Sequence, residues 1–360
     1  MTQQAMQASR SGSLRAPTAN VAVVIPIPND PDWSIFEELA EEVPIIVVDD
    51  SDGKLAPAPR GNVRFFDHAA QRDVMGKHYH AIPHKSAATR NFGHYLAYRE
   101  GCDVILALDY DCRPRPGWLE QHLSSLGPTD GVPALAGAWI NSVEQPGFYA
   151  RGYPYEYRNP EAAAVAESVA SGEVKVNMGV WDNVLDLNGI DKLERTPPAE
   201  PGLRGPANYA ALGNLPLCGM NVAFTADVTP AYFFLPDVSV HGWPLSRHDD
   251  IWGGYILKRI MDLRGDLITF GRPVVEHTRQ SRMERVLVIE HYMHLMSMQF
   301  YAIVETSLDR VAPGSYAEMF GWFAQEYRRE VEAVPGLPLH YREAFRELGI
   351  WMERWSACFA

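Results

Sequence analysis

The sequence has few cysteines, no long apolar run and no excess of positive charge. Its four cysteines form no CxxC pair and stand at no zinc-site spacing, as expected of reduced, buried thiols in a cytoplasmic protein. No apolar run approaches the roughly 18 residues of a membrane span, and the N-terminus lacks the apolar core of a signal peptide. The net charge of −13 argues against nucleic acid and anionic membranes as partners.

Three widespread nucleotide-binding or catalytic motifs are also missing. There is no GxGxxG, so the fingerprint of a dinucleotide-binding fold is absent and we expect neither flavin nor NAD. There is no GxxxxGK[ST] phosphate-binding loop and no GxSxG nucleophile elbow. These absences direct attention to the acidic and arginine-rich segments that the chain does contain.

Short β-branched runs alternate with helical patterns in the first third of the chain. Residues 21–25, 44–48 and 104–108 read as buried strands, and 32–42 and 85–100 read as helices. This alternation predicts a doubly wound α/β sheet, in which ligands bind beyond the carboxyl ends of the strands.

Three regions follow from this pattern. We expect a flexible tail over 1–20, a catalytic domain over 21–280 and a helical region over 281–360. Within the catalytic domain, 140–215 is rich in Gly, Pro, Tyr and Asn and is read as long loops and short strands. The C-terminal helices would be the contact surface of a homo-oligomer.

An acidic pair follows the third predicted strand. Asp109 and Asp111 on an extended tip could hold Mg²⁺ or Mn²⁺ against a diphosphate, although the same pattern also occurs in solvated loops. His277 follows another strand-like segment and could be a third ligand that favours Mn²⁺ over Mg²⁺. The alternative for His277 is a purely structural role.

Other charged segments have two readings each. Asp249 and Asp250 precede a helix, either as its N-terminal cap or as acceptors in a site. Arg151 and Arg158 flank a Tyr-rich segment that could stack on sugars and bind diphosphate, or form a surface turn. Lys85 and Arg90, near the start of their predicted helix, could bind phosphate or could be solvated charges. The residues alone leave these alternatives open.

Five segments in order resemble the reversibly glycosylated polypeptide family, glycosyltransferase family 75, whose plant members include UDP-arabinopyranose mutases. They are KSAATRNFG at 85–93, LDYDC at 108–112, FYARGYPYEYR at 148–158, PLCGMNVAF at 216–224 and RHDDIWGGY at 247–255, leading to His277. The resemblance covers about residues 21–280. It implies a GT-A fold with a doubly wound mixed sheet, Mn²⁺ or Mg²⁺, and pyranose–furanose interconversion of a nucleotide-diphosphate sugar.

The resemblance also implies roles for individual residues. Asp109, Asp111 and His277 match the metal site. Arg158, Arg151, Asp249 and Asp250 are the expected catalytic residues. The expected substrate-binding residues are Asp49, Lys85, Arg90, Asn91, Tyr153, Trp181, Gly219, Asn221 and Trp252.

Two departures from the family pattern bear on the metal site and on the identity of the nucleotide base. Tyr110 stands where the family has the middle aspartate of a triple Asp, so it cannot bind a metal as a carboxylate would. Residues 48–52 (VDDSD) replace the family's Gln-Asp-Gly-Asp, which makes guanosine as well as uridine an option for the base. We therefore expect a bacterial GDP-sugar branch of the family.

Ring contraction requires three events: the bond from C1 to the diphosphate breaks, the pyranose ring opens, and O4 closes on C1. One hypothesis has a nitrogen of Arg158, or less favoured Arg151, hold C1 covalently with help from Asp249 or Asp250, since arginine is normally protonated. In its rival, O4 attacks C1 directly. Outside mutases, the alternatives are a GT-A glycosyltransferase that passes the sugar to an acceptor and a non-catalytic binding protein.

Overall fold

The computed structural model describes residues 19–29, 31–53, 61–159, 165–195, 208–278 and 282–360. The expected flexible tail falls almost wholly on 1–18, outside the described residues. Within the described part of the chain, no helix is both long enough and apolar enough to cross a membrane.

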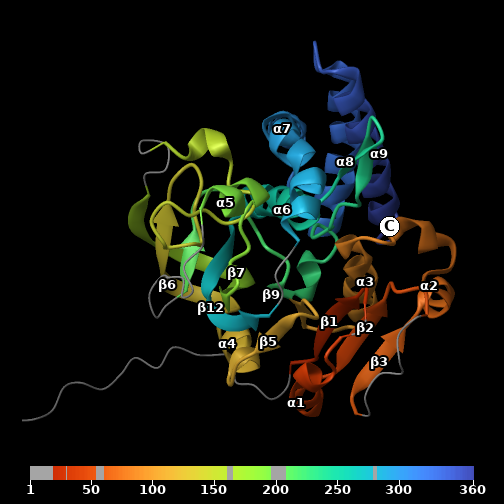
Figure 1. The fold of residues 1–360 in the computed structure, drawn as a ribbon, viewed down its shortest axis with the longest axis vertical. Helices are drawn as coiled ribbons and strands as arrows, with labels where there is room; N and C mark the ends of the chain where they lie inside the picture. Colours follow the sequence, from red (N-terminus) through yellow and green to blue (C-terminus); the bar gives the residue numbers. More distant parts are fainter. Residues whose placement is uncertain (1–18, 30, 54–60, 160–164, 196–207, 279–281) are drawn as a thin grey trace, which may run out of the picture.

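One large mixed sheet organises the described residues (Figure 1). Its strands, in spatial order, are β3 (Val63–Phe66), β2 (Ile45–Asp49), β1 (Val21–Ile27), β4 (Val104–Leu108), β9 (Asn221–Thr225), β7 (Ala166–Asn183), β6 (Gly127–Ala136), β8 (Tyr209–Ala211), β12 (Asp266–His277) and β5 (Cys112–Pro114). The first four in this order pair in parallel, and β9 joins them antiparallel to β4. A separate hairpin pairs β10 (Val238–Val240) with β11 (Trp243–Leu245).

The β-branched runs of β1, β2 and β4 form the centre of the parallel half. Strands β2 and β4 are buried throughout, as expected for strands covered on both faces. After β1 the chain passes to β2 on one side, and it later returns to β4 on the other. This reversal of strand order brings the ends of β1, β2 and β4 together at the edge where open α/β sheets bind ligands.

Helices cover both faces of the sheet. They are α1 (Ser34–Glu42), α2 (His68–Met75), α3 (Asn91–Arg99), α4 (Trp118–Ser124), α5 (Gly189–Glu194), α6 (Asp249–Arg264), α7 (Met283–Leu308), α8 (Tyr316–Ala333) and α9 (Leu339–Ser356), with a 3₁₀ turn η2 (Ala87–Arg90) before α3. Figure 1 shows α1 and α4 on one side and α3 and α6 on the other. Gly93 lets α3 lie against β1, because a Cβ there would be 2.3 Å from Cγ1 of Val24.

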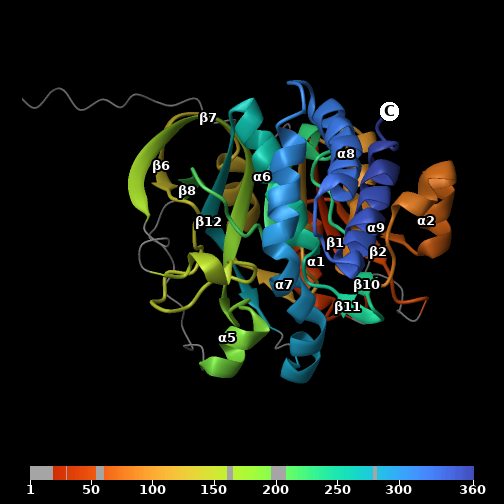
Figure 2. The ribbon, with the colours of Figure 1, turned by 90° about the horizontal axis from the view of Figure 1, so that it is seen from above.

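The three C-terminal helices pack together and share the core of the sheet domain (Figure 2). Phe300 of α7 stacks on Trp252 of α6 with ring centroids 4.2 Å apart, and Trp355 of α9 stacks on Phe233 at 5.2 Å. The expectation of a doubly wound mixed α/β sheet with a helical C-terminal extension is confirmed.

One expectation for the middle of the chain was wrong. Residues 166–183 form the 18-residue strand β7, not short strands between loops. This strand pairs with β6, β9 and β12, so its stability comes from backbone pairing on both sides. Its first half is exposed and poor in β-branched residues, which is why its sequence resembled a loop.

Candidate active site

A cavity of about 1100 Å³ lies where the ends of β1, β2 and β4 meet. Pro28, Asp50 and Asp109 line it from the strand ends, and Arg247 and Arg285 line it from the later part of the chain. Ligand sites commonly have volumes of roughly 300–1,000 Å³, so a nucleotide sugar would fit here. Helix α7 contributes part of the lining, so the cavity includes the region predicted to follow the catalytic domain.

The acidic pair after β4 reaches this cavity, as the sequence predicted. Both Asp109 and Asp111 line it. Arg90 donates from Nη2 to Oδ1 of Asp109 at 2.7 Å and from Nη1 to the carbonyl of Gly219 at 2.7 Å. Arg90 thereby fixes one carboxylate of the pair and leaves Asp111 to face the cavity.

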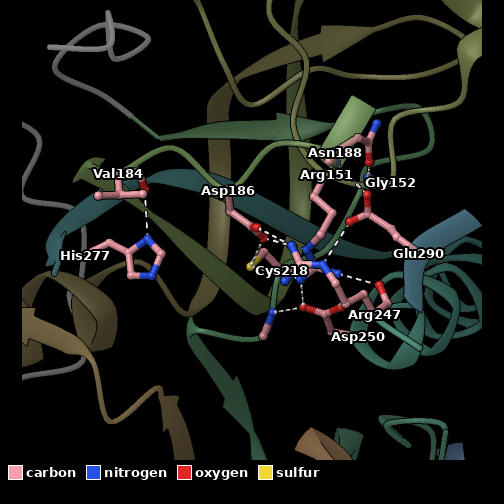
Figure 3. Close-up of polar contacts among 12 residues, drawn as sticks. Arg151, Gly152, Val184, Asp186, Asn188, Cys218, Arg247, Asp250, His277 and Glu290 are labelled. Atoms are coloured by element: carbon pink, nitrogen blue, oxygen red, sulfur yellow. Dashed lines mark hydrogen bonds and ion pairs between the residues drawn. The ribbon is translucent and has the colours of Figure 1, made fainter. Parts of the chain in front are cut away.

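His277 comes to the acidic pair from the end of β12. Its Nδ1 lies 2.8 Å from the carbonyl oxygen of Val184, an acceptor only, so Nδ1 carries the proton (Figure 3). In the neutral imidazole the opposite nitrogen, Nε2, is then the unprotonated one, and it lies 4.0 Å from Oδ2 of Asp111. This tautomer is the one a metal-binding histidine needs.

Asp109, Asp111 and His277 are donor types that a divalent cation takes, but their ligand atoms do not all lie within 4.8 Å of one another in the described structure, so the metal site stays a prediction. Two carboxylates with an imidazole suit Mn²⁺, and the carboxylates alone also suit Mg²⁺. Burial, with the neighbouring charge of Asp109, raises the pKa of Asp111 to about 6. A bound cation would offset that concentration of negative charge.

Arg151 is the most heavily bonded side chain at the cavity (Figure 3). Its guanidinium donates from Nε to Oδ2 of Asp186 at 2.6 Å and from both Nη atoms to the carboxylate of Asp250 at 2.9 and 2.6 Å. Arg247 also donates to Asp186, at 2.9 Å, and to Glu290 at 2.8 Å. Two arginines thus share three carboxylates in a network with little access to water.

Burial and pairing oppose each other in this network. Burial alone would lower the pKa of Arg151, but Asp186 and Asp250 raise that pKa well above its ordinary value on balance. Burial would raise the pKa of Asp250, and Arg151 outweighs it so that the pKa falls. Burial and the charge of Asp250 raise the pKa of Asp249 to about 7. Asp249 and Asp250 therefore differ, and Asp250 is the carboxylate that bonds an arginine.

Arg158 lies elsewhere. It does not line the cavity, and its guanidinium makes two hydrogen bonds to the carboxylate of Asp191 at 2.6 and 3.0 Å. It also stacks on Tyr155, with Cζ 3.8 Å from the ring centroid. Of the two predicted arginines, the structure places Arg151 at the cavity, whereas the sequence analysis favoured Arg158.

The predicted substrate-binding residues divide into two groups. Lys85 and Arg90 line the cavity. Buried without lining it are Asp49, Asn91, Tyr153, Trp181, Gly219, Asn221 and Trp252. Asn91 donates to the carbonyl of Phe234 at 2.8 Å, and Asn221 accepts from the indole of Trp118 at 2.8 Å. Direct contact with a ligand stays a prediction for all seven of these buried residues.

The sequence analysis missed several residues of the cavity. Asp186 lies in the region 140–215, which was predicted to be mostly loops. Arg247 lies in the same motif as Asp249 and Asp250, and only these two carboxylates were considered as site residues. Asp50 lines the cavity, whereas the side chain of its neighbour Asp49 is turned to the backbone N–H of Ser51 at 2.7 Å. Asp50 belongs to residues 48–52, which the sequence analysis related to the base without giving Asp50 itself a role.

Comparisons with known proteins agree with this arrangement. The model of the reversibly glycosylated polypeptide family matches residues 18–309. UDP-arabinopyranose mutase 1 of Arabidopsis thaliana is 26% identical over 273 residues, 72% of this chain and 71% of the relative. UDP-arabinopyranose mutase 1 of Oryza sativa subsp. japonica is 24% identical over 293 residues, 75% and 76% of the two chains.

Among solved structures, a mannosyltransferase from Pyrobaculum calidifontis in complex with GDP-Man and Mn²⁺ is similar with a TM-score of 0.34 and 10% identity, covering 97% of this chain and 90% of that chain. The family match is the stronger finding, because it spans most of the chain. It takes in the strand-end carboxylates, the Arg151 network and the part of α7 that lines the cavity. The chain therefore belongs to the reversibly glycosylated polypeptide family.

Proposed function

We propose that this protein is a metal-dependent, flavin-independent mutase that interconverts the pyranose and furanose forms of a UDP- or GDP-linked sugar. The observation that carries the proposal is Arg151, held by two carboxylates in the wall of the cavity that Asp109 and Asp111 also line. Curated relatives named UDP-arabinopyranose mutases support the same reaction class.

The charges of the cavity suit a sugar diphosphate. Asp109, Asp111 and His277 would hold the divalent cation, which when bound neutralises the diphosphate as a leaving group. Arg282 and Arg285 line the cavity from the start of α7 and can meet phosphate oxygens with forked hydrogen bonds. Positive side chains and a cation together would offset the net acidity of the chain at this point.

The reacting carbon, C1, must be held while the ring opens. In the proposed step a nitrogen of Arg151 forms a bond to C1, and the bond from C1 to the diphosphate oxygen breaks with its electron pair. The guanidinium loses a proton, which Asp250 is positioned to accept because both Nη atoms already donate to it. Since the pKa of Arg151 is raised, the proton must leave as the bond forms and not before. The C1–O5 bond then opens as O5 takes a proton, and O4 closes on C1 with loss of its own proton, so that the sugar is a furanose still bound to Arg151. A diphosphate oxygen finally attacks C1, and the C1–N bond breaks as Asp250 returns the proton to the guanidine.

Matched arginine substitutions test this step. Arg151→Lys should abolish both turnover and the labelled sugar adduct found after incubation with a radiolabelled nucleotide sugar. Arg158→Lys removes the other arginine, which lies outside the cavity, and should leave the adduct on Arg151 in peptide mapping by mass spectrometry. Retained turnover without an adduct in Arg151→Lys would instead support direct attack by O4.

The acceptor requirement separates the mutase from a glycosyltransferase. A mutase converts its substrate alone, whereas a transferase gives a glycosylated product only when an acceptor is supplied. The identity of the base, the sugar and the cytoplasmic location remain predictions.

A further inference from the structure

A second group of metal-ligand side chains lies at the end of β2, outside the acidic pair of β4. Asp50, His68 and His84 each offer one ligand atom, and these atoms lie within 4.8 Å of one another. Asp50 comes directly after β2, His68 begins α2, and His84 precedes η2. The sequence analysis considered Asp50 only as part of residues 48–52, which bear on the base, and it did not consider His68 or His84.

The distances are close to those of a metal site. Nε2 of His68 is 2.8 Å from Oδ1 of Asp50, and Nδ1 of His84 is 3.6 Å from the same oxygen. Tetrahedral ligands with bonds of about 2.1 Å lie roughly 3.4 Å apart, so shifts of an ångström or less would complete the geometry. The two imidazole rings are 4.4 Å apart between centroids and converge on the carboxylate.

His84 supplies an independent indication of a ligand. Both of its ring nitrogens are buried, and neither has a hydrogen-bond partner among the residues that the structure describes. A buried polar atom without a hydrogen-bond partner destabilises the folded protein unless a ligand satisfies it. Coordination through Nδ1 would satisfy one of these nitrogens.

The carboxylate is held in position for this task. Asp50 is 4% exposed, and its Oδ2 accepts the backbone N–H of Lys85 at 2.5 Å. Lys85 adopts a left-handed φ of 61°, which is uncommon for a residue with a side chain and directs its N–H to the carboxylate. Oδ1 is left to face the two histidines.

We propose that Asp50, His68 and His84 form a second divalent-cation site, selective for a borderline transition metal such as Zn²⁺. Two imidazoles with one carboxylate suit Zn²⁺ and Co²⁺ better than Mg²⁺ or Ca²⁺. The site is two strand positions from Asp109, because β1 lies between β2 and β4, which is a separation of roughly 10 Å. Since Asp50 lines the cavity, an open coordination position would face it. The proposal does not depend on the mutase reaction.

Cobalt binding tests the site directly. The test uses the chain with Asp109→Asn and Asp111→Asn, stripped of metal with a chelator. In this variant the site at Asp109 and Asp111 is disabled, and the second site is intact. Titration of this variant with Co²⁺ should give visible ligand-field bands and one tightly held equivalent by equilibrium dialysis. Adding His84→Gln should remove both signals, and so should adding His68→Gln; the two side chains are similarly exposed, at 23% and 26%.

Two controls make the result decisive. His80→Gln removes an exposed histidine of the neighbouring 3₁₀ turn and should change neither the bands nor the stoichiometry. Thermal unfolding of each variant establishes that it is folded. The proposal is overturned if the folded Asp109→Asn, Asp111→Asn background binds no Co²⁺, or if its binding survives both His68→Gln and His84→Gln. That outcome would leave the cluster as a hydrogen-bonded ion pair.

Discussion

The buried charges at the cavity are paired, arginine with carboxylate. Replacement of a single residue should therefore change the stability of the protein strongly. Arg247 joins Asp186 to Glu290, and Arg151 joins Asp186 to Asp250. Removing one member of a buried group leaves its partners without compensation, which costs far more than the group contributes as a whole. Exposed ion pairs contribute much less.

Arg247→Ala should lower the free energy of unfolding by about 3–5 kcal/mol, since Asp186 and Glu290 would be left buried with a missing partner. Arg64→Ala is the matched control, because Arg64 pairs with Glu100 and its side chain is 45% exposed. Its loss should be under about 1 kcal/mol. Urea unfolding measures the unfolding free energy of both variants. Equal losses would show that the buried network contributes no more to stability than an exposed ion pair.

Asp111→Asn should lower turnover on the order of 100-fold or more, because the side chain would no longer help hold a cation against the departing diphosphate. Isothermal titration with Mn²⁺ should show weaker binding in the same variant. Asp227→Asn changes an exposed carboxylate that pairs with Lys175 and should leave both quantities unchanged. Wild-type Mn²⁺ affinity in Asp111→Asn would remove Asp111 from the metal site.

His122 gives a prediction for pH. Burial lowers its pKa to about 4 in the folded protein, and the ordinary value is near 6.5. Between these values the unfolded state binds more protons, so this residue makes stability fall by about 1.4 kcal/mol per unit as pH falls from 6.5 to 4. In His122→Gln the unfolding free energy should fall less steeply over that window. An unchanged pH dependence would contradict the assignment of a buried, neutral imidazole.

Elements differ in how far the sequence predicted them. Strands β1, β2 and β4 were predictable because burial on both faces selects β-branched runs, and the C-terminal helices were predictable from their apolar periodicity. Strand β7 was not, because long-range pairing rather than side-chain type holds its exposed first half. Local sequence patterns therefore predict which strands are buried, but they do not predict which strands pair with one another.

The choice between Arg151 and Arg158 shows the same limit at the site. Both stand in one aromatic segment, seven residues apart by number, and nothing local separates them. Their partners, Asp186 and Asp191, lie about 35 residues later, in a region whose structure could not be predicted from the sequence. The place of Asp109 and Asp111 at the cavity was predictable because they follow the end of a strand.

The contact of α3 with the sheet yields a test at this scale. Gly93→Ala should lower the free energy of unfolding by about 1–3 kcal/mol, because the new Cβ would meet Val24 at 2.3 Å and Val48 at 3.0 Å. Gly131→Ala is the control, since its Cβ would be 3.4 Å from the nearest atom, on Val169. Chemical denaturation compares the two, and equal stability would mean that α3 can move away from β1 freely.

At the scale of the whole molecule, the predicted boundary at residue 280 separates chain regions that share one core. Phe300 and Trp355 pack on the sheet domain, and α7 lines the cavity. A chain ending at residue 280 should therefore fail to give a cooperative thermal transition, whereas the intact chain should unfold in one step. A stable, folded truncation would establish two independent domains. Self-association through the C-terminal helices stays a prediction, which light scattering would check.

The most direct test of the account is incubation of the purified protein with Mn²⁺ and a panel of UDP- and GDP-sugars in the absence of any acceptor. Anion-exchange separation and NMR of each new peak would follow. The account predicts a product of unchanged mass with furanose ring couplings, and the nucleotide that gives it would identify the base. Free nucleotide alone, or conversion only after an acceptor is added, would contradict the mutase proposal and favour a glycosyltransferase.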